Sequence, residues 1–193
     1  MKLPQIETAN THIQLLTFEQ SHLLCDYYQR NKTHLHAWEP HRTDEFYTPE
    51  FWQNQVEVSI NMFDKKQAVR LVVLDKEQTQ VIATCNFSNI VFGCFQACHL
   101  GYSIDKNYEG KGIMVEVLQA GIQYMQNEFN LHRIMANHLP NNHRSAKLLQ
   151  RLGFEKEGYA KDYLKINGRW QDHVLNALTL TFHGISQKQG NYL

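Results

Sequence analysis

The sequence predicts an α+β fold in which a mostly antiparallel sheet is flanked by helices. Short β-branched and apolar runs follow one another in the middle of the chain, which is typical of an antiparallel meander. Segments whose apolar residues recur every three or four positions precede and follow these runs and indicate helices. The chain has 193 residues. Neither an internal repeat nor a Pro/Gly-rich linker divides it, so a single domain is expected over residues 1–193.

The first third of the chain is expected to hold one strand and two helices. Residues 12–18 form a short apolar run and are the first expected strand. Between residues 18 and 38 the apolar side chains have helical spacing. A second helix is expected after Pro49, because proline is well tolerated in a first helical turn. Its apolar residues are Phe51, Trp52, Val56, Val58 and Ile60.

The pattern changes to strands at residue 68. Three apolar and β-branched runs, separated by a polar turn at 75–80 and by Gly93, occupy residues 68–74, 81–89 and 94–105. Their order predicts a meander of antiparallel strands.

The last third alternates helices and strands and ends in a hairpin. A helix, a strand and a helix are expected at residues 112–129, 133–138 and 142–152. Gly153 lies where a helix C-cap is expected. The final strands, residues 159–166 and 169–180, flank Asn167 and Gly168, the dipeptide best suited to a type I′ turn.

Charge and hydropathy exclude several classes of partner. The 19 Lys and Arg residues balance the 19 Asp and Glu residues. Proteins that track phosphates need clustered positive charge, so no direct nucleic-acid binding is expected. No run approaches the roughly 20 apolar residues of a membrane span, and the first ten residues lack the apolar core of a secretory signal. A soluble, cytoplasmic protein without a membrane partner is expected.

The cysteines do not have the spacing of a disulfide framework or a metal site. Cys94 and Cys98 precede His99, but a second Cys or His pair at ligand spacing is lacking, so no metal is expected. Reduced, packed thiols are expected at Cys25, Cys85, Cys94 and Cys98.

The most informative stretch, residues 100–114, runs from a strand through a turn with Gly110 and Gly112 into a helix. A helix N-terminus offers unpaired N–H groups and the positive end of the helix dipole. Glycines there let an anionic group approach, although they would also serve a tight turn that binds nothing. The spacing is not that of a mononucleotide P-loop, and a meander does not suit a dinucleotide-binding unit.

Two further features accompany this turn. Gly101, inside the preceding strand, predicts a bulge or a close backbone approach, and a strand that splays there leaves backbone groups free for an amide-containing ligand arm. A diphosphate at the helix start and a peptide-like arm along the strand together describe coenzyme A. Asn142 and Ser145 are three residues apart, on one helix face near its N-terminus. Helix capping alone also explains these two residues.

In this order the motifs resemble the GCN5-related N-acetyltransferase (GNAT) family over nearly the whole chain. They are LGYSID (100–105), NYEGKGIM (107–114), N-x-x-S (142–145) and LLQRLGFEKEGY (148–159). The resemblance implies one acetyltransferase domain of GNAT-like fold, a splayed strand pair at the cofactor site, and acetyl-CoA as cosubstrate. Asn107 stands where the family usually has Gln or Arg, which weakens one phosphate contact and leaves the backbone donors intact.

The resemblance also implies a role for individual residues. The turn would bind the pyrophosphate, the strand would pair with pantetheine, and Asn142 would contact the pantetheine arm. The implied cofactor-binding residues are Tyr102, Ser103, Ile104, Glu109, Gly110, Lys111, Gly112, Ile113, Met114 and Asn142. Ser145 would protonate the leaving thiolate. Related enzymes often carry a Glu base where this chain has His99, whose neutral imidazole is able to accept a proton; Asp162 is the alternative base.

Within the family, the run HRIMANHLPNNHRSAKLLQRLGFEKEGYAKDYLKINGRWQDHVL (132–175) is most like the RimJ-type ribosomal-protein alanine N-acetyltransferases. This implies acetylation of an N-terminal alanine of a small-subunit ribosomal protein, including on the assembling subunit. An α-amino group has a pKa of about 7.7–8 against about 10.4 for lysine, so a weak base suffices. The alternatives are a small-amine acetyltransferase, for a polyamine or an antibiotic, and a non-catalytic CoA-binding ribosome-assembly protein.

Substrate choice is expected to depend on the N-terminal half. Residues 38–52 combine five aromatic residues with four acids and Arg42, a local charge of −3. This composition suits a basic protein tail. A solvated loop over an aromatic core explains it equally well.

Overall fold

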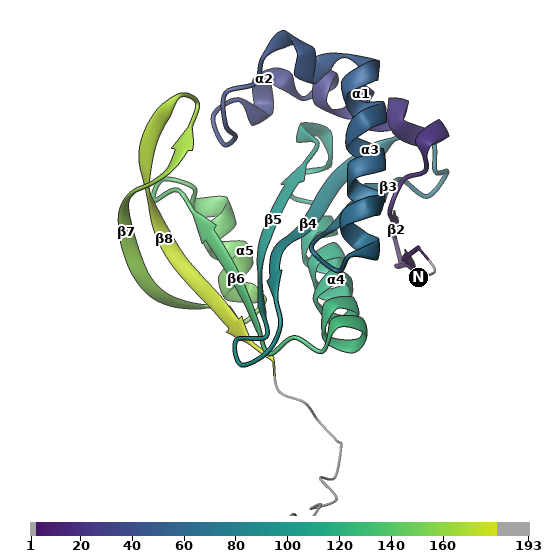
Figure 1. Ribbon diagram of the computed structural model, residues 1–193. Coiled ribbons are helices and arrows are strands. Elements are labelled where there is room, and N and C mark those ends of the chain that lie inside the picture. Colours follow the sequence, from purple (N-terminus) through teal and green to yellow (C-terminus); the bar gives the residue numbers. More distant parts are fainter. Residues whose placement is uncertain (1–2, 181–193) are drawn as a thin grey trace, which may run out of the picture.

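The computed structural model describes residues 3–180, and one sheet organises this part of the chain (Figure 1). Its strand order is β1-β2-β3-β4-β5-β6-β8-β7. Neighbouring strands are antiparallel except for the parallel pair β5–β6. The strands are β1 (Gln5–Glu7), β2 (His12–Gln14), β3 (Val69–Leu74), β4 (Val81–Val91), β5 (Ala97–Ile104), β6 (Arg133–His138), β7 (Glu155–Ile166) and β8 (Arg169–Thr179).

Helices cover both faces of the sheet. The helices within residues 18–64 pack over one face of the sheet, and the helices within residues 113–151 pack over the other (Figure 1). The α-helices are α1 (Ser21–Arg30), α2 (Lys32–Leu35), α3 (Pro49–Asp64), α4 (Ile113–Phe129) and α5 (His143–Arg151). Three short 3-10 helices are η1 (Phe18–Gln20), η2 (Asp44–Tyr47) and η3 (Lys106–Tyr108).

The alternation of side chains along the central strands creates two separate cores. Leu71 of β3 and its cross-strand partner Cys85 face α4 and belong to the core that also holds Val117. Val72, one residue along β3, belongs to the other core, which includes Trp52 of α3. In the following subsections we call these the α4 face and the α3 face of the sheet.

Between β5 and β6 the sheet opens. The two strands pair only from Ala97 to His99. Beyond His99, β5 remains paired with β4, and β6 remains paired with β8. The backbone edge of β5 that faces β6 is therefore unpaired over the LGYSI segment. The expected splayed strand pair is confirmed, and it divides the two halves of the sheet.

The bulge expected at Gly101 is wrong. Gly101 pairs with Asn86 in an unbroken register, and the irregularity between β4 and β5 lies at Ser88 and Val91 instead. The free edge arises from the divergence of β6. The alternative expectation, a close backbone approach, is also wrong, because a Cβ built at Gly101 would meet nothing within 4 Å.

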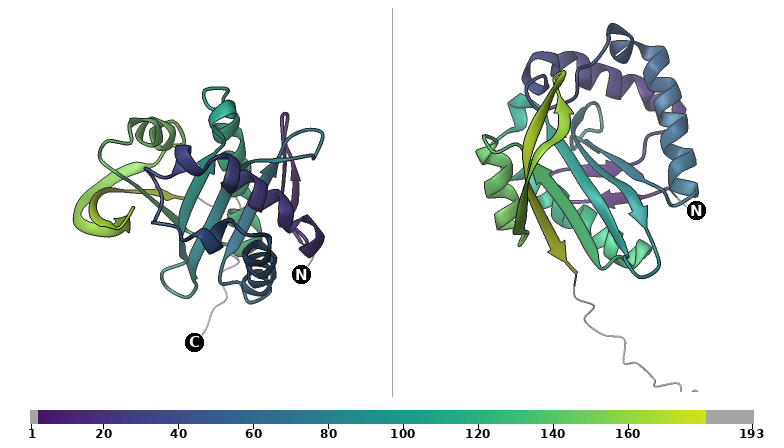
Figure 2. Two further views of the ribbon diagram at one scale, coloured as in Figure 1. Left: turned by 90° about the horizontal axis from the view of Figure 1, so that it is seen from above. Right: turned by 60° about the vertical axis from the view of Figure 1, so that its left-hand side comes forward.

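The hairpin β7–β8 turns at Asn167 and Gly168, whose positive φ angles of 43° and 77° fit the expected type I′ turn. Its tip reaches the segment between α2 and α3, as Figure 2 shows. There the N–H of Asn167 donates to the carbonyl of Glu39 at 3.0 Å. The hairpin and the helical segment therefore meet across the end of the sheet where β5 and β6 diverge.

Other sequence predictions are confirmed or need correction. The meander, the helix after Pro49 and the last three elements lie where expected. The helix expected over residues 18–38 is broken at Asn31, whose buried side chain is bonded to other groups, and β1 was not expected. Cys94 is exposed, whereas the other three cysteines are buried as expected.

Residues 3–180 contain neither a cluster of metal ligands nor a membrane-spanning helix. Within these residues, His, Cys, Asp and Glu do not gather in groups of three that would hold a metal ion. None of the helices in the same range is long and apolar enough to cross a membrane. The single-domain expectation also covers residues 1–2 and 181–193, which lie outside the described residues.

Candidate active site

A cavity of about 1050 Å³ lies at the open end of the sheet. Its lining contains all the predicted cofactor-binding residues except Lys111, and also Ser145. Tyr102 and Ile104 belong to the core on the α4 face, whereas Ser103 points to the α3 face. The lining continues to Leu35 and Trp38, at the end of α2. The cavity therefore reaches both faces of the sheet where β5 and β6 diverge.

The start of α4 forms one end of the cavity. Gly112 is the N-cap residue and has no side chain to cap the helix, so the first N–H groups of α4 are left for another acceptor. Gly110 and Gly112 have φ angles of 74° and 79°, a left-handed conformation that favours glycine. A Cβ at either position would meet nothing within 4 Å. The turn is therefore open enough for an anionic group to reach the backbone.

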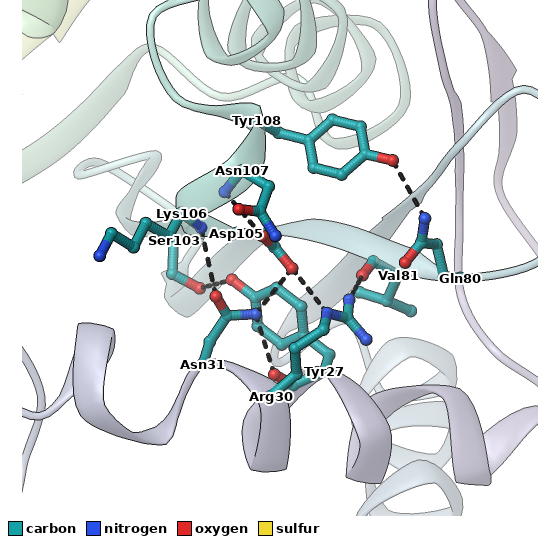
Figure 3. Close-up of polar contacts among 10 residues, drawn as sticks. All are labelled: Tyr27, Arg30, Asn31, Gln80, Val81, Ser103, Asp105, Lys106, Asn107 and Tyr108. Carbon is teal, nitrogen blue, oxygen red and sulfur yellow. Dashed lines mark hydrogen bonds and ion pairs between the residues drawn. The ribbon is translucent and has the colours of Figure 1, made fainter.

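A buried carboxylate anchors this turn (Figure 3). Asp105 is 1% exposed and accepts hydrogen bonds from Arg30 Nε at 2.7 Å and from Asn31 Nδ2 at 3.0 Å. It also accepts from the N–H of Asn107 at 2.8 Å, which caps η3. Burial acts to raise the pKa of Asp105, but the hydrogen bonds from Asn31, Arg30 and Asn107 outweigh it and lower the pKa. Helix α1 thus holds the turn in place.

Cationic side chains surround the same end of the cavity. Arg144 forms an ion pair with Glu109, whose other oxygen lies 3.5 Å from His34 Nε2. Lys111 is not part of the lining, and its Nζ lies 4.9 Å from the centre of the Tyr108 ring. The cations in the lining, which the sequence analysis did not single out, are Lys106, Arg144, Lys147 and Arg151. Three of them recur along one side of α5, and this spacing was the signal that would have found them.

Tyr102 and Ser145 come together in the lining of the cavity. Tyr102 OH and Ser145 Oγ are 2.6 Å apart and are hydrogen bonded. Burial raises the pKa of Tyr102 to about 12, although the bond to Ser145 acts in the opposite direction. Asn142 caps α5, since its Oδ1 accepts from the N–H of Ser145 at 3.0 Å. The capping interpretation of Asn142 is confirmed, and it fixes the position of Ser145.

The two proposed bases lie outside this cavity lining. His99 is on the α3 face, at the last residue of β5 that pairs with β6. Burial lowers the pKa of His99. Its Nδ1 is buried and has no hydrogen-bond partner in the described structure. Asp162 is exposed in an irregular part of β7, and its N–H donates to Asp172 Oδ1 at 2.9 Å.

One carboxylate of the acidic segment 38–52 faces the cavity, whereas the other acids of the segment face solvent. Glu39 lines the cavity, and its side chain is 18% exposed. Its Oε2 is 3.4 Å from Arg42 Nη2. Burial raises the pKa of Glu39 in spite of Arg42. The remaining acids of the segment, Asp44, Glu45 and Glu50, are exposed, over an aromatic cluster in which the Tyr28 and Trp52 rings stack at 4.6 Å.

Comparisons with known proteins agree with this geometry. A family model described as an acetyltransferase (GNAT) domain matches residues 13–155. The chain is 47% identical over 176 residues to the ribosomal protein uS5-alanine N-acetyltransferase of Escherichia coli, covering 91% of this chain and 90% of that protein.

Solved structures have the same fold. That of a ribosomal-protein-S5-alanine acetyltransferase from Vibrio fischeri has a TM-score of 0.87 at 40% identity, covering 91% of this chain and 96% of the other. A RimJ structure from Mycobacterium smegmatis, in complex with CoA-disulfide, has a TM-score of 0.83 at 22% identity over 92% and 86% of the two chains. The splayed strands and the open turn before α4 agree with the match to the family model and with the identity to the E. coli enzyme. The chain therefore belongs to the GNAT family and is an N-acetyltransferase.

Proposed function

We propose that this enzyme transfers an acetyl group from acetyl-CoA to the N-terminal α-amine of ribosomal protein uS5, on alanine, in the cytoplasm. The observation that carries the proposal is the cavity that crosses the sheet between β5 and β6. It offers one end to an anionic cofactor and the other to an amine. The identity to the E. coli uS5-alanine enzyme over 91% of the chain supports the choice of acceptor.

The residues present on the α4 face fit coenzyme A. The open N–H groups after Gly112, with Arg144, Lys147 and Arg151 near them, suit phosphate groups. The unpaired edge of β5 suits an amide-containing arm, which would pair with it as an added strand. When bound, acetyl-CoA supplies an acetyl group activated as a thioester. The N–H groups on the same free edge are proposed to stabilise the developing oxyanion.

The transfer replaces a C–S bond by a C–N bond, so one proton must leave the amine and one must reach sulfur. The Tyr102–Ser145 pair is proposed to supply the second proton. Because the pKa of Tyr102 is raised to about 12, its phenol stays protonated at neutral pH. Its bond to Ser145 at 2.6 Å allows the two hydroxyls to act as a relay.

For the first proton three groups are candidates. His99 and Asp162 are the bases proposed from the sequence. Glu39 is added here because its carboxylate lines the cavity and its raised pKa suits a base. An α-amine is partly neutral at pH 7, so a moderate base at this position is sufficient.

The test is thiol release from acetyl-CoA with different acceptors. An Ala-starting peptide with the N-terminal sequence of uS5 is compared with the same peptide blocked at its α-amine, and with spermidine. We expect release with the free peptide alone, with mass spectrometry locating the acetyl group on the α-nitrogen. Preference for spermidine would support the small-amine alternative, and coenzyme A binding without release on any amine would support a non-catalytic role.

A further inference from the structure

A second cavity, of about 370 Å³, lies on the α3 face of the sheet. Its floor consists mostly of polar side chains of β3 and β4, and its walls are aromatic residues of α1, α3 and η2 together with aliphatic residues such as Leu15 and Leu24. The residues on which the following argument depends are Arg42, Trp52, Arg70, Thr84 and Asn86. We call it the arginine cavity.

Two buried N–H donors of the arginine cavity lack acceptors. Trp52 is 7% exposed, and its Nε1 has no hydrogen-bond partner among the described residues. The Nε atom of Arg42 is also buried and unpartnered there. Buried donors are normally paired in folded proteins, so each exception calls for an explanation. Two of them in the lining of one cavity point to a ligand that supplies acceptor atoms.

The charge of the arginine cavity specifies the acceptor further. Arg42 and Arg70 both line it, whereas Asp and Glu are absent from its lining over residues 3–180. Arg70 Nη1 is 3.3 Å from Gln55 Oε1, and Arg42 Nη2 is 3.4 Å from Glu39, so both have long polar contacts. Glu39 pairs with Arg42 from outside this lining, and Arg70 has no carboxylate partner in the described part of the lining. Two guanidinium groups and an indole N–H in a lining without Asp or Glu suit an anionic oxygen group, above all a carboxylate.

The arginine cavity adjoins the cavity of the candidate active site. Two contacts form the boundary, and each joins a residue of one lining to a residue of the other. Ser103 Oγ and Thr84 Oγ1 are 2.8 Å apart. The Glu39–Arg42 pair forms the second contact. A chain that enters the active site from the α3 face therefore passes next to the arginine cavity.

Three residues in register across β5, β4 and β3 set the distance from the splayed strands to Arg70. Gly101 pairs with Asn86, and Asn86 pairs with Arg70, so the three point to the α3 face in line. Gly101 is open, which leaves a free path from the splayed strands. Neighbouring strands are about 4.8 Å apart, and an extended chain advances about 3.3 Å per residue. An extended acceptor polypeptide therefore covers the two strand spacings with about three residues beyond its N-terminal residue.

We propose that the arginine cavity binds a carboxylate side chain at the third or fourth residue of the acceptor polypeptide. The proposal rests on the proposed function, since it describes how that acceptor would be chosen. It differs from the basic tail that the composition of residues 38–52 suggested. Three of the four acids of that segment are exposed, Glu39 lines the other cavity and pairs with Arg42, and arginines line the arginine cavity.

The first experiment measures kcat/KM for Ala-starting peptides that are otherwise neutral and carry Glu, Gln or Lys at one position from 2 to 6. We expect Glu to exceed Gln by about tenfold at position 3 or 4, with Lys below both. Equal rates for Glu and Gln at every position, or a preference for Lys, would overturn the proposal.

Variants connect the preference to the arginine cavity. In Arg42→Gln/Arg70→Gln the Glu-to-Gln ratio should fall to about one, and Arg70→Glu should favour the Lys peptide. Lys65→Gln, which removes a charge from the exposed end of α3, is the matched control and should keep the ratio. Thermal melting verifies that each variant is folded. A ratio that persists in the double variant would contradict the proposal.

A binding readout separates this proposal from the proposed function. The chain has three tryptophans, so indole N–H signals of ¹⁵N-labelled protein are few and assignable. Addition of the Glu peptide with CoA should shift the Trp52 signal, whereas the Gln peptide should not, and Trp170, which is 61% exposed on the hairpin, serves as an internal control. A Trp52 shift without acetylation of any peptide would refute the function alone. Acetylation without a Trp52 shift would refute the arginine cavity alone.

Discussion

At Tyr102 and Ser145, two hydroxyls from different elements meet at 2.6 Å in the lining of the cavity. A strand residue and a residue in the first turn of α5 come together because Asn142 caps that helix and fixes the N–H of Ser145. The Asn142 cap therefore fixes the backbone at Ser145, and the hydrogen bond between the two hydroxyls fixes them relative to each other. Such preorganisation is what proton transfer to a leaving group needs.

We expect Tyr102→Phe and Ser145→Ala each to lower kcat by about 10²-fold, because each interrupts the proton path to sulfur. The KM for acetyl-CoA should change little. The two losses should not add in the double variant, since both residues act on one proton. Steady-state thiol release with the Ala peptide measures kcat and KM for the two single variants and the double variant. Fully multiplicative losses would mean that the hydroxyls act separately.

At Glu39 the question is which group receives the proton of the amine. We expect Glu39→Gln to lower kcat/KM by about tenfold to a hundredfold at pH 7. The loss should narrow by pH 9, because the α-amine, with a pKa of about 7.7–8, then needs no base. In the parent enzyme the rate should rise with pH through the raised pKa of Glu39.

His99→Ala is the matched comparison for this prediction. Burial lowers the pKa of His99, so its imidazole is neutral at pH 7 and able to accept a proton. A pH-dependent loss in His99→Ala, with none in Glu39→Gln, would assign the base to the imidazole. Arg42 is the charged group that acts to lower the pKa of Glu39 against burial, and the Glu39 carboxylate in turn acts to raise the pKa values of Tyr27, Tyr28 and Tyr47.

Among the elements, the turn between β5 and α4 depends on α1. Asp105 joins Arg30, Asn31 and the N–H of Asn107 in one buried network. The break after α1 has its reason here, because the Asn31 side chain turns inward to Asp105 and to the carbonyl of Tyr27. The turn between β5 and α4 is thus tied to a helix about 75 residues earlier in the chain.

We expect Asp105→Asn to lower the free energy of unfolding by about 3 kcal/mol at pH 7, because it leaves Arg30 without its carboxylate. The pKa of Asp105 is lowered in the fold. Its contribution is therefore complete above the unfolded pKa and is lost as the pH falls through the folded one. The difference between parent and variant should shrink below about pH 4, as urea unfolding would measure. Asp26→Asn, on the exposed side of α1, is the matched control and should leave the free energy of unfolding at pH 7 almost unchanged.

At this scale the sequence predicted most of what local rules control. The hairpin at Asn167-Gly168 and the helix after Gly112 follow from turn and capping chemistry. What it could not predict depends on distant partners. Asn31 ends α1 because of Asp105, and β1 exists because β2 offers it an edge. Gly101 was expected to mark a bulge, but the opening comes from β6, which local patterns at Gly101 do not describe.

The candidate site likewise contains residues that the sequence predicted and residues that only the fold reveals. The turn and Ser145 were found because their motifs are continuous in sequence. Glu39, by contrast, lies in an acidic segment in which five aromatic residues and three exposed acids give it no distinguishing pattern. Only the fold brings it to the cavity. The pairing of Tyr102 with Ser145 likewise joins residues 43 positions apart.

Across the whole molecule, the opening in the sheet would separate the two proposed ligands, coenzyme A and the acceptor. The glycine turn and α5 lie with the α4 face, whereas α2, Glu39 and Gly101 lie on the α3 side. A side chain added at Gly101 would project onto the α3 face alone, because residues along a strand alternate. The position is open and its φ is not positive, so the fold should accept it.

We therefore expect Gly101→Leu to separate the two binding events. The variant should fold and bind coenzyme A with little change, since its new side chain does not face the glycine turn. The KM for the Ala peptide should rise by at least about tenfold, because the added side chain occupies the path of the acceptor toward the strands. Calorimetry with coenzyme A and steady-state kinetics with the peptide measure the two effects. Gly101→Ala, with one methyl group, should give an intermediate value. If coenzyme A binding fell while the peptide KM stayed the same, the two ligands would not approach from opposite faces of the sheet.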